Sequence, residues 1–226
     1  MIIAIDGPAA AGKGTLARRL AEHLGLIYLD TGLIYRAVGK KAVDNGFDLE
    51  DVVSVEAIAR ALTLEDLEVG GLRTDEVAQL ASKVSAIPSV RAALLEFQRS
   101  FAEAPPLGKR GAVLDGRDIG TVVCPNAHLK LFVTASTRVR AQRRFKELQK
   151  RGLEAIYARV LGDIKERDTR DSSRAISPLE PASDAYQLDT SALDANQVFA
   201  KALEIVGAVG IGARDPEEDE VQNEAL

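Results

Sequence analysis

Nine residues near the N-terminus have the types and spacing of a loop that binds phosphate groups. They are Gly7, Pro8, Ala9, Ala10, Ala11, Gly12, Lys13, Gly14 and Thr15. Small side chains allow backbone N–H groups to surround a phosphate, and the lysine adds a positive charge for the β- and γ-phosphates of a nucleotide. The strict motif has Ser or Thr directly after the lysine, whereas here Gly14 takes that position and the hydroxyl of Thr15 follows.

Arginine is concentrated in one stretch of an otherwise acidic chain. The net charge is −5, yet nine arginines fall between positions 138 and 174: Arg138, Arg140, Arg143, Arg144, Arg151, Arg159, Arg167, Arg170 and Arg174. An acidic protein with a local excess of arginine suits a compact, highly charged small molecule better than a nucleic acid.

The last three of these arginines follow a three- and four-residue spacing, which places them on one helix face. Phosphoryl transfer needs positive charge around the transferred group and little covalent chemistry from the protein, so converging arginines can act by electrostatics and positioning. The alternative is a solvated helix face on which neighbouring acids neutralise them. Arg143 or Arg144 would line the adenine or the phosphates of ATP.

Charged residues follow the apolar run at 112–114 directly, as Asp115, Arg117 and Asp118. Such residues are poor core material at a strand end, but they suit a site that orders magnesium-bound water and a phosphate. The alternative is a charged turn.

A second group of polar residues follows the apolar run at 26–29. Asp30 and Thr31 come directly after it, and both would also serve as an ordinary helix N-cap. Arg36 lies further into the same predicted helix, where it reaches either a phosphate or a surface acid. Arg73 and Thr74 repeat the pattern before another predicted helix.

The elements that must position these residues alternate between short apolar runs and helical patterns. Strands are predicted at 2–6, 26–29, 112–114, 129–133 and 185–188. Helices are predicted at 14–24, at several places between 32 and 101, after Val133, and at 195–209, with breaks near Gly46, Gly70 and Pro88. We therefore predict an α/β fold in which helices cover both faces of a parallel sheet and the binding site lies beyond the carboxyl ends of the strands.

The composition excludes several other classes. Hydrophobic residues make up 46% and charged residues 28%, as in an ordinary globular protein. Nothing resembles a leader or a membrane span, so we expect a cytoplasmic protein with no membrane or nucleic-acid partner. Cys124 has no second cysteine to pair with, and His23 and His128 are isolated, so no metal site made directly by the protein is expected. The acidic segment 213–226 is expected to be disordered.

Five blocks, in this order, resemble the bacterial cytidylate kinases: GPAAAGKGT, LDTGLIYR, LRTDEVA, LDGRDIGTVV and IKERDTRDSSRAISPL. The resemblance covers most of residues 1–210. It implies the three-layer fold of P-loop NTPases in a single kinase domain, 1–212, with a small NMP-binding region at about 35–100 and a short arginine-rich lid at about 150–178. One departure is that the small β-sheet inserted in the familiar bacterial enzymes is largely deleted, since only residues 62–72 stand in its place.

The resemblance also assigns roles to individual residues. The whole phosphate loop binds ATP. Arg36 and Arg117 meet the α-phosphate of the acceptor nucleotide, and Asp118 lies near the base or its bound arginine. The acceptor and lid residues together are Thr31, Arg36, Arg73, Arg117, Asp118, Arg167, Asp171 and Arg174, with Asp171 near the ribose. The implied catalytic residues are Lys13, Arg117, Asp118, Arg167 and Arg174.

The implied activity is transfer of the γ-phosphoryl group of ATP to CMP or dCMP, giving ADP and CDP or dCDP. Mg²⁺ would arrive with ATP and be held by its phosphates and by water, near Asp115. Adenylate kinase is the nearest relative of this family. It ranks second as an interpretation because its acceptor-binding sequence usually differs from GRDIGTVV. A regulatory module that binds ATP without turnover is the third. We expect a monomer.

Overall fold

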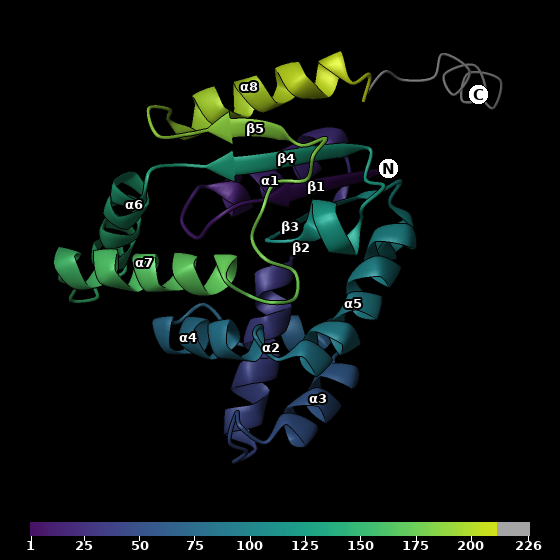
Figure 1. The fold of residues 1–226 in the computed structure, drawn as a ribbon. Helices are drawn as coiled ribbons and strands as arrows, with labels where there is room; N and C mark the ends of the chain where they lie inside the picture. Colours follow the sequence, from purple (N-terminus) through teal and green to yellow (C-terminus); the bar gives the residue numbers. More distant parts are fainter. Residues whose placement is uncertain (212–226) are drawn as a thin grey trace.

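The computed structural model describes residues 1–211. Within them, five strands form one sheet: β1 (Ile2–Asp6), β2 (Ile27–Asp30), β3 (Ala112–Gly116), β4 (Leu129–Thr134) and β5 (Tyr186–Asp189). Their order across the sheet is β2-β3-β1-β4-β5, and every neighbouring pair is parallel (Figure 1). The strands predicted from the sequence are confirmed, with ends displaced by at most two residues.

The helices connect and cover these strands. They are α1 (Lys13–Leu24), α2 (Thr31–Asp44), α3 (Val52–Arg60), α4 (Asp75–Val84), α5 (Pro88–Glu103), α6 (Thr137–Lys150), α7 (Tyr157–Ser172) and α8 (Ala195–Ala208). The predicted breaks are confirmed, since Gly46 lies between α2 and α3 and Pro88 opens α5. A five-residue π-helical turn, η3 (Ile119–Val123), follows β3 and was not predicted.

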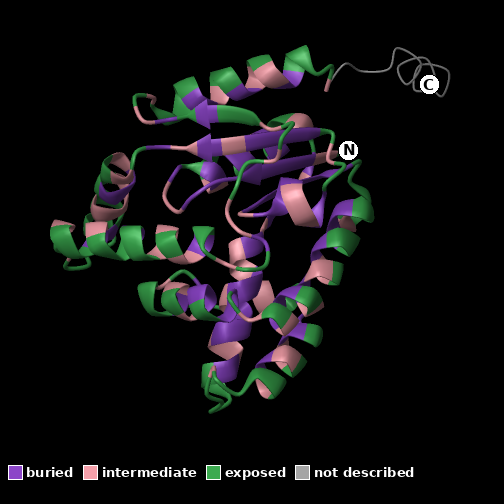
Figure 2. Cartoon of the chain, viewed as in Figure 1, coloured by how far each residue is buried: buried purple, intermediate pink, exposed green. Residues whose placement is uncertain are grey.

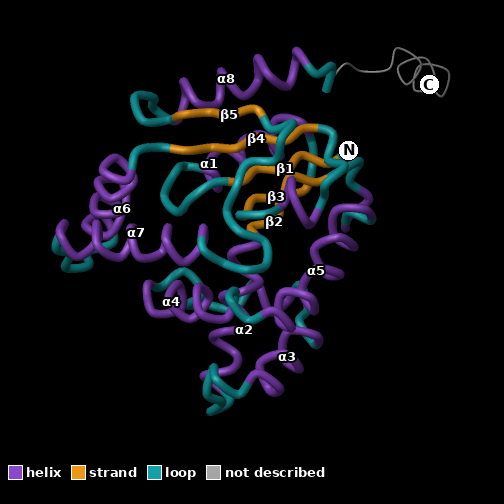
Figure 3. The backbone as a smooth tube through the Cα atoms, viewed as in Figure 1, coloured by secondary structure: helices purple, strands orange, loops and turns teal. Residues whose placement is uncertain are grey.

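The central strands are buried on both faces because their side chains alternate between two apolar cores. Ile3 and Ile5 of β1 face a core made with α1 and α8, and Ala4 faces a second core made with α5 and η3. Figures 2 and 3 show these strands buried between helical layers. Ile3 and Ile5 are fully buried, and burial of each such side chain stabilises the folded state by roughly 1.5–3 kcal/mol.

Two groups of helices extend beyond the sheet. Helices α2, α3, α4 and α5 enclose a core of their own that includes Ile34, Val38, Val55 and Leu94. Helices α6 and α7 pack on each other through a smaller core around Ile164. Figure 1 shows both groups on the same side of the sheet, away from α8.

The segment between α3 and α4 contains a short 3₁₀ helix, η1 (Glu65–Leu67), and turns. Residues 61–74 are all described, and none of them forms a strand. The region where the small sheet was expected to be missing therefore holds only this short connection.

No helix within residues 1–211 is both long and apolar enough to cross a membrane. The segment 213–226, which was expected to be disordered, lies outside the described residues.

Candidate active site

The phosphate loop leaves the end of β1 and runs directly into α1. Gly7 has a φ of 143°, and a Cβ at this position would lie 1.9 Å from the carbonyl oxygen of Val133, so β4 leaves room only for glycine. The ammonium of Lys13 is buried and donates to the carbonyl of Pro8 at 2.8 Å. Burial and the nearby charge of Arg117 lower the pKa of Lys13 to about 7. An anion bound in the loop would favour the charged form of the lysine.

Helix α6 supports the loop from outside through two arginines. Arg140 is buried, donates to the carbonyl of Ala9 at 3.2 Å and forms an ion pair with Asp168 of α7. Arg143 donates to the backbone and hydroxyl of Thr190 at 2.6 and 2.9 Å, and to the carbonyl of Ala11 in the loop at 3.4 Å. Both side chains therefore contact the loop backbone, and the expected contact of Arg143 or Arg144 with the adenine or the phosphates of ATP stays a prediction.

Three carboxylates lie at the ends of adjacent strands. The sheet register places Asp30 beside Asp115, and Asp6 beside Gly116. Burial, followed by the charge of Asp30, raises the pKa of Asp115 to about 6, and burial likewise raises the pKa of Asp6 to about 6. Carboxylate oxygens are ligands that Mg²⁺ accepts, so Asp30 and Asp115 fit a magnesium ion at the carboxyl ends of these strands. Within residues 1–211 no group of three or more His, Cys, Asp or Glu side chains is arranged to hold a metal ion.

Four charged residues form one cluster between β3 and the end of α7: Arg117, Arg167, Asp171 and Arg174. Arg117 Nε donates to Asp171 Oδ2 at 2.8 Å, Arg167 Nε lies 3.9 Å from the same oxygen, and Arg174 Nε donates to the Asp171 carbonyl at 3.3 Å. Burial alone would raise the pKa of Asp171, but Arg117 and Arg167 hold it below its usual value. Burial, then Arg117, lowers the pKa of Arg167 to about 10.

Two nitrogens of this cluster are buried and make no hydrogen bond to the described part of the chain. They are Arg167 Nε and Arg174 Nη2. A buried donor without a partner is costly, so both groups are suited to an anionic or polar ligand. Arg167 and Arg174 therefore do not lie on a solvated helix face, whereas Arg170 pairs with Glu166 as that interpretation expected.

A small cavity of about 60 Å³ lies behind this cluster. Its charged lining includes the ion pair between Arg91 of α5 and Asp118, whose side chains are only 7% and 9% exposed. The Arg91 guanidinium lies 5.5 Å from the centre of the Tyr35 ring, and its Nη1 donates to the carbonyl of Ser85 at 3.2 Å. The cavity thus presents a carboxylate and a guanidinium beside an aromatic ring.

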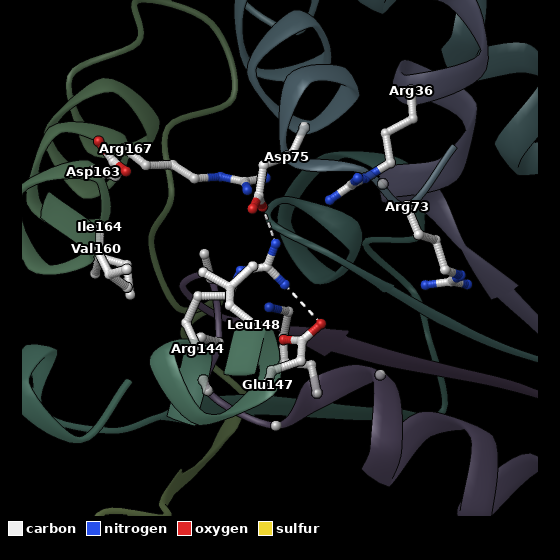
Figure 4. Close-up of a pocket in the computed structure, with 18 of the residues that line it drawn as sticks. Arg36, Arg73, Asp75, Arg144, Glu147, Leu148, Val160, Asp163, Ile164 and Arg167 are labelled. Atoms are coloured by element: carbon white, nitrogen blue, oxygen red, sulfur yellow. Dashed lines mark hydrogen bonds and ion pairs between the residues drawn. The ribbon is translucent and has the colours of Figure 1, made fainter. Parts of the chain in front are cut away.

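A larger cavity of about 1110 Å³ extends from the phosphate loop to α4, α6 and α7 (Figure 4). Arg36 and Arg73 lie on one side of it, and Arg167 points in from α7. Arg36 donates to the carbonyl of Leu72 at 2.9 Å, and Arg73 lies 3.2 Å from Asp30. Each of these arginines keeps further N–H groups for a ligand.

Contacts across this cavity join α6 and α7 to α4. Arg144 forms an ion pair with Asp75, drawn as a dashed line in Figure 4, and also pairs with Glu147. Arg170 donates to the hydroxyl of Ser82 at 2.8 Å. The arginine-rich helices therefore lie against the helical region that carries Arg36 and Arg73.

Comparison with known proteins identifies the family. The sequence profile of the family described as cytidylate kinase matches residues 3–208. The chain belongs to the cytidylate kinase family. It is 67% identical over 207 residues to the cytidylate kinase of Paramagnetospirillum magneticum, which covers 92% of this chain and 98% of that protein. It is 58% identical over 206 residues to that of Methylocella silvestris, which covers 91% of this chain and 94% of that protein.

One solved structure supports the fold alone. An uncharacterised protein from Eubacterium ventriosum has a TM-score of 0.53 and 14% identity, covering 95% of this chain and 99% of that one. The α/β architecture of this cytidylate kinase family member is thus shared with a protein of very different sequence.

The structure brings most of the expected site residues together. Residues 9–15 of the phosphate loop line the larger cavity together with Arg36, Arg73, Arg117 and Arg167, whereas Thr31, Asp118, Asp171 and Arg174 line the smaller one. Asp115 lines the larger cavity beside Lys13. The charged-turn interpretation of residues 115–118 is wrong, because Asp115 and Asp118 are buried and paired inside the protein.

One expected local role is not observed. Asp30 occupies the N-cap position of α2, but its side chain makes no capping hydrogen bond. Thr31 donates to the carbonyl of Asp115 at 2.8 Å instead, and so ties the start of α2 to the end of β3. The second expected cap is present, since Thr74 accepts from the backbone N–H of Val77 at 3.3 Å.

Two residues of the site were missed by sequence reasoning. Arg91 lies on α5 among buried apolar residues such as Val90 and Leu94, and a charge on that apolar stripe was the available signal. Asp6 accepts from the backbone N–H groups of Ile119 and Gly120 at 2.8 and 2.7 Å. Its signal was an apolar strand that ends in aspartate, as β2 does.

Proposed function

We propose that the protein transfers the γ-phosphoryl group of ATP to CMP or dCMP, giving ADP and CDP or dCDP. The observation that carries the proposal is the position of Arg117 and Arg167, which line both cavities. An acceptor nucleotide whose base lies in the small cavity would have its phosphate beside these two arginines, facing the phosphate loop. The close relatives in the cytidylate kinase family support the same reaction.

The donor phosphates bind in the phosphate loop, where Lys13 contacts the β- and γ-phosphates. When bound with ATP, Mg²⁺ neutralises negative charge on these phosphates. Asp115 and Asp30 supply the carboxylates beside Lys13 and Gly14 at the cavity wall, and they would hold the ion through water. The role of these residues is to orient the donor for in-line attack.

The acceptor phosphate is held by Arg36 and Arg117, with Arg73 at the edge of the same cavity. Arg167 and Arg174 approach from the lid side and neutralise charge that builds up on the transferred group. The attacking oxygen belongs to a phosphate that is already ionised, so the protein supplies no general base. Catalysis by these residues is positioning and electrostatic stabilisation.

Base selection takes place in the small cavity. The edge of cytosine presents an amino donor beside a ring-nitrogen acceptor, which complements the Asp118 carboxylate and the Arg91 guanidinium. Uracil reverses this pattern and would leave buried polar groups unpaired, which is costly. Since residues 61–74 contain no strand, an inserted sheet contributes nothing to this choice.

The two helical groups form the moving parts of a single kinase domain, 1–212. The NMP-binding region is about 35–100, and the arginine-rich lid is about 150–178. Closure of the lid excludes water and so prevents hydrolysis of ATP, with Asp171 contacting the acceptor ribose. We propose that the enzyme acts as a cytoplasmic monomer.

The test is an assay of ADP release with MgATP against CMP, dCMP, UMP and AMP in parallel. We expect strong turnover of CMP and dCMP and weak turnover of AMP. Asp118→Asn replaces an acceptor by a donor, so it should move the CMP to UMP ratio toward UMP. Asp44→Asn on the surface of α2 is the matched control and should keep the wild-type ratio. Preference for AMP, or ATP binding without turnover of any acceptor, contradicts the proposal.

A further inference from the structure

Gly14 stands where the strict phosphate-loop motif has a hydroxyl, and a different hydroxyl lies next to it. A Cβ at position 14 would lie 3.4 Å from the hydroxyl of Tyr28 and 3.6 Å from Asp115 Oδ2. The Tyr28 hydroxyl donates to the other carboxylate oxygen, Asp115 Oδ1, at 3.0 Å. The space beside residue 14 is therefore shared by a phenol and a carboxylate.

The tyrosine reaches this place from β2, and it is held there from two sides. Sheet register sets Tyr28 beside Val113, two residues before Asp30, so the Tyr28 and Asp30 side chains lie on the same face of the strand. Its ring packs against the core between the sheet and α1. The guanidinium of Arg18, one helical turn after Gly14, lies 5.5 Å from the ring centre. The hydroxyl is thus fixed at the wall of the larger cavity, which Tyr28 lines.

We propose that Tyr28 is a positioning residue for the donor half of the site: its hydroxyl replaces the one that the strict motif carries after the lysine, and it orients Asp115 toward magnesium-bound ATP. The inference rests on the proposed function, in which MgATP binds at this loop. In the strict motif the hydroxyl contacts the metal itself. Here the hydroxyl instead holds the carboxylate that faces the metal and its water.

The chemistry of the pair supports this assignment. Burial raises the pKa of Tyr28, and the charge of Asp115 raises it further, so the phenol remains a donor. Asp115 accepts that bond with one oxygen, and its second oxygen lies on the Gly14 side. A Cβ at position 14 would be in van der Waals contact with the Tyr28 hydroxyl, so a serine hydroxyl attached to it would lie close to the place that the tyrosine hydroxyl occupies.

The first test compares wild type with Tyr28→Phe by calorimetric titration of ATP, with and without Mg²⁺. The quantity of interest is the gain in ATP affinity that Mg²⁺ provides. A hydrogen bond to a charged group is lost, so we expect this gain to fall about tenfold in Tyr28→Phe, with little change in metal-free ATP binding or in CMP binding. Tyr186→Phe on β5, where the side chain is 46% exposed, is the matched control.

A rescue experiment separates positioning from general structural damage. Tyr28→Phe combined with Gly14→Ser returns a hydroxyl to the same space, and it should restore most of the gain in ATP affinity that Mg²⁺ provides. Tyr28→Phe combined with Gly14→Ala adds the Cβ without the hydroxyl and should restore none of this gain. Asp115→Asn, which keeps the tyrosine, should lose the magnesium-dependent gain by itself, so the inference remains testable if a Tyr28 variant folds poorly.

Three results would overturn the inference: an unchanged gain in Tyr28→Phe, an equal loss of ATP affinity with and without Mg²⁺, or equal recovery by serine and alanine at position 14. Failure of the proposed function has a separate signature, because wild-type protein would then prefer AMP or turn over no acceptor in the ADP-release assay, whatever the titrations of Tyr28→Phe give.

Discussion

The two halves of the site, proposed above to bind the donor and the acceptor, are built in opposite ways. The donor half is one continuous loop of small residues, shaped by its backbone and closed by the backbone of β4 at Gly7. The acceptor half is assembled from side chains on α2, α5, α7 and the turn between β3 and η3, and it is held together by ion pairs such as those of Asp118 with Arg91 and of Asp171 with Arg117.

This difference shows how each half obtains its specificity. A triphosphate is common to all nucleoside triphosphates, so a loop of backbone N–H groups and one lysine is sufficient to bind it. Telling one base from another requires buried donors and acceptors in a fixed pattern, which in turn requires charged side chains to be paired inside the protein. The acceptor half should therefore be the half in which replacing one charged side chain damages folding as well as activity.

The largest effect is expected from Lys13→Ala in the donor half. Removal of the only lysine in the loop takes away a buried charge at the transferred phosphate, so kcat should fall by about 10³-fold, equivalent to about 4 kcal/mol. Steady-state kinetics with CMP and MgATP measure it, and urea unfolding should show that the protein stays folded. Wild-type turnover in this variant would remove Lys13 from the mechanism.

The next largest effect is expected at the buried pair of the acceptor half. Arg91→Met leaves the Asp118 carboxylate buried without its partner, so the free energy of unfolding should fall by about 3 kcal/mol. The double variant Arg91→Met and Asp118→Leu removes both charges and should regain much of that stability while remaining inactive toward CMP. Equal stability of the single and double variants in urea unfolding would show that the pair is not coupled.

Asp6 joins the two halves, and its pKa predicts a pH dependence. The folded-state pKa is about 6, above the ordinary value of 3.8, so the folded protein binds this proton more tightly than the unfolded chain does. The resulting stability is present below pH 4 and is lost as the pH rises through 6. Wild type should lose about 2 kcal/mol more stability than Asp6→Asn between pH 4 and 7. The free energy of unfolding of both proteins can be measured with urea across this pH range. An equal fall with rising pH in wild type and in Asp6→Asn would contradict the prediction.

The smallest effect is expected from Ala10→Gly, which tests the backbone of the donor loop alone. Ala10 has a φ of 60°, a left-handed conformation that costs an alanine roughly 1 kcal/mol and a glycine almost nothing. The greater flexibility of unfolded glycine offsets most of that gain, so the free energy of unfolding should change by less than about 1 kcal/mol. Gly7→Ala, in contrast, should be strongly destabilising, and similar results for both variants would show that the loop adapts to side chains.

The sequence was sufficient for the donor half because its information is local. Nine consecutive residues define the loop, and apolar runs on either side define the strands and helices that hold it. Arg36, Arg73 and Arg117 were also found, since each lies in a short block next to an element boundary. Their convergence on one cavity follows from the parallel sheet, whose strand ends share an edge.

The missed residues depend on contacts that no local pattern contains. Arg91 pairs with Asp118, which lies 27 positions away, and its own helix has an otherwise ordinary apolar stripe. Asp6 bonds backbone groups 113 and 114 positions away. The N-cap interpretation of Asp30 failed for the same reason, because its carboxylate pairs with Arg73 across the cavity instead of with its own helix.

The central place of β1 has a consequence for how the chain is made. On the ribosome β1 is synthesised first, but its two neighbours in the sheet are β3 and β4, which begin at Ala112 and Leu129. The apolar residues of β1 have no paired strand until more than half of the chain has emerged, and pairing over such a separation carries a large loop-closure cost. A nascent chain that ends before residue 112 contains the whole phosphate loop but neither of the strands that pair with β1.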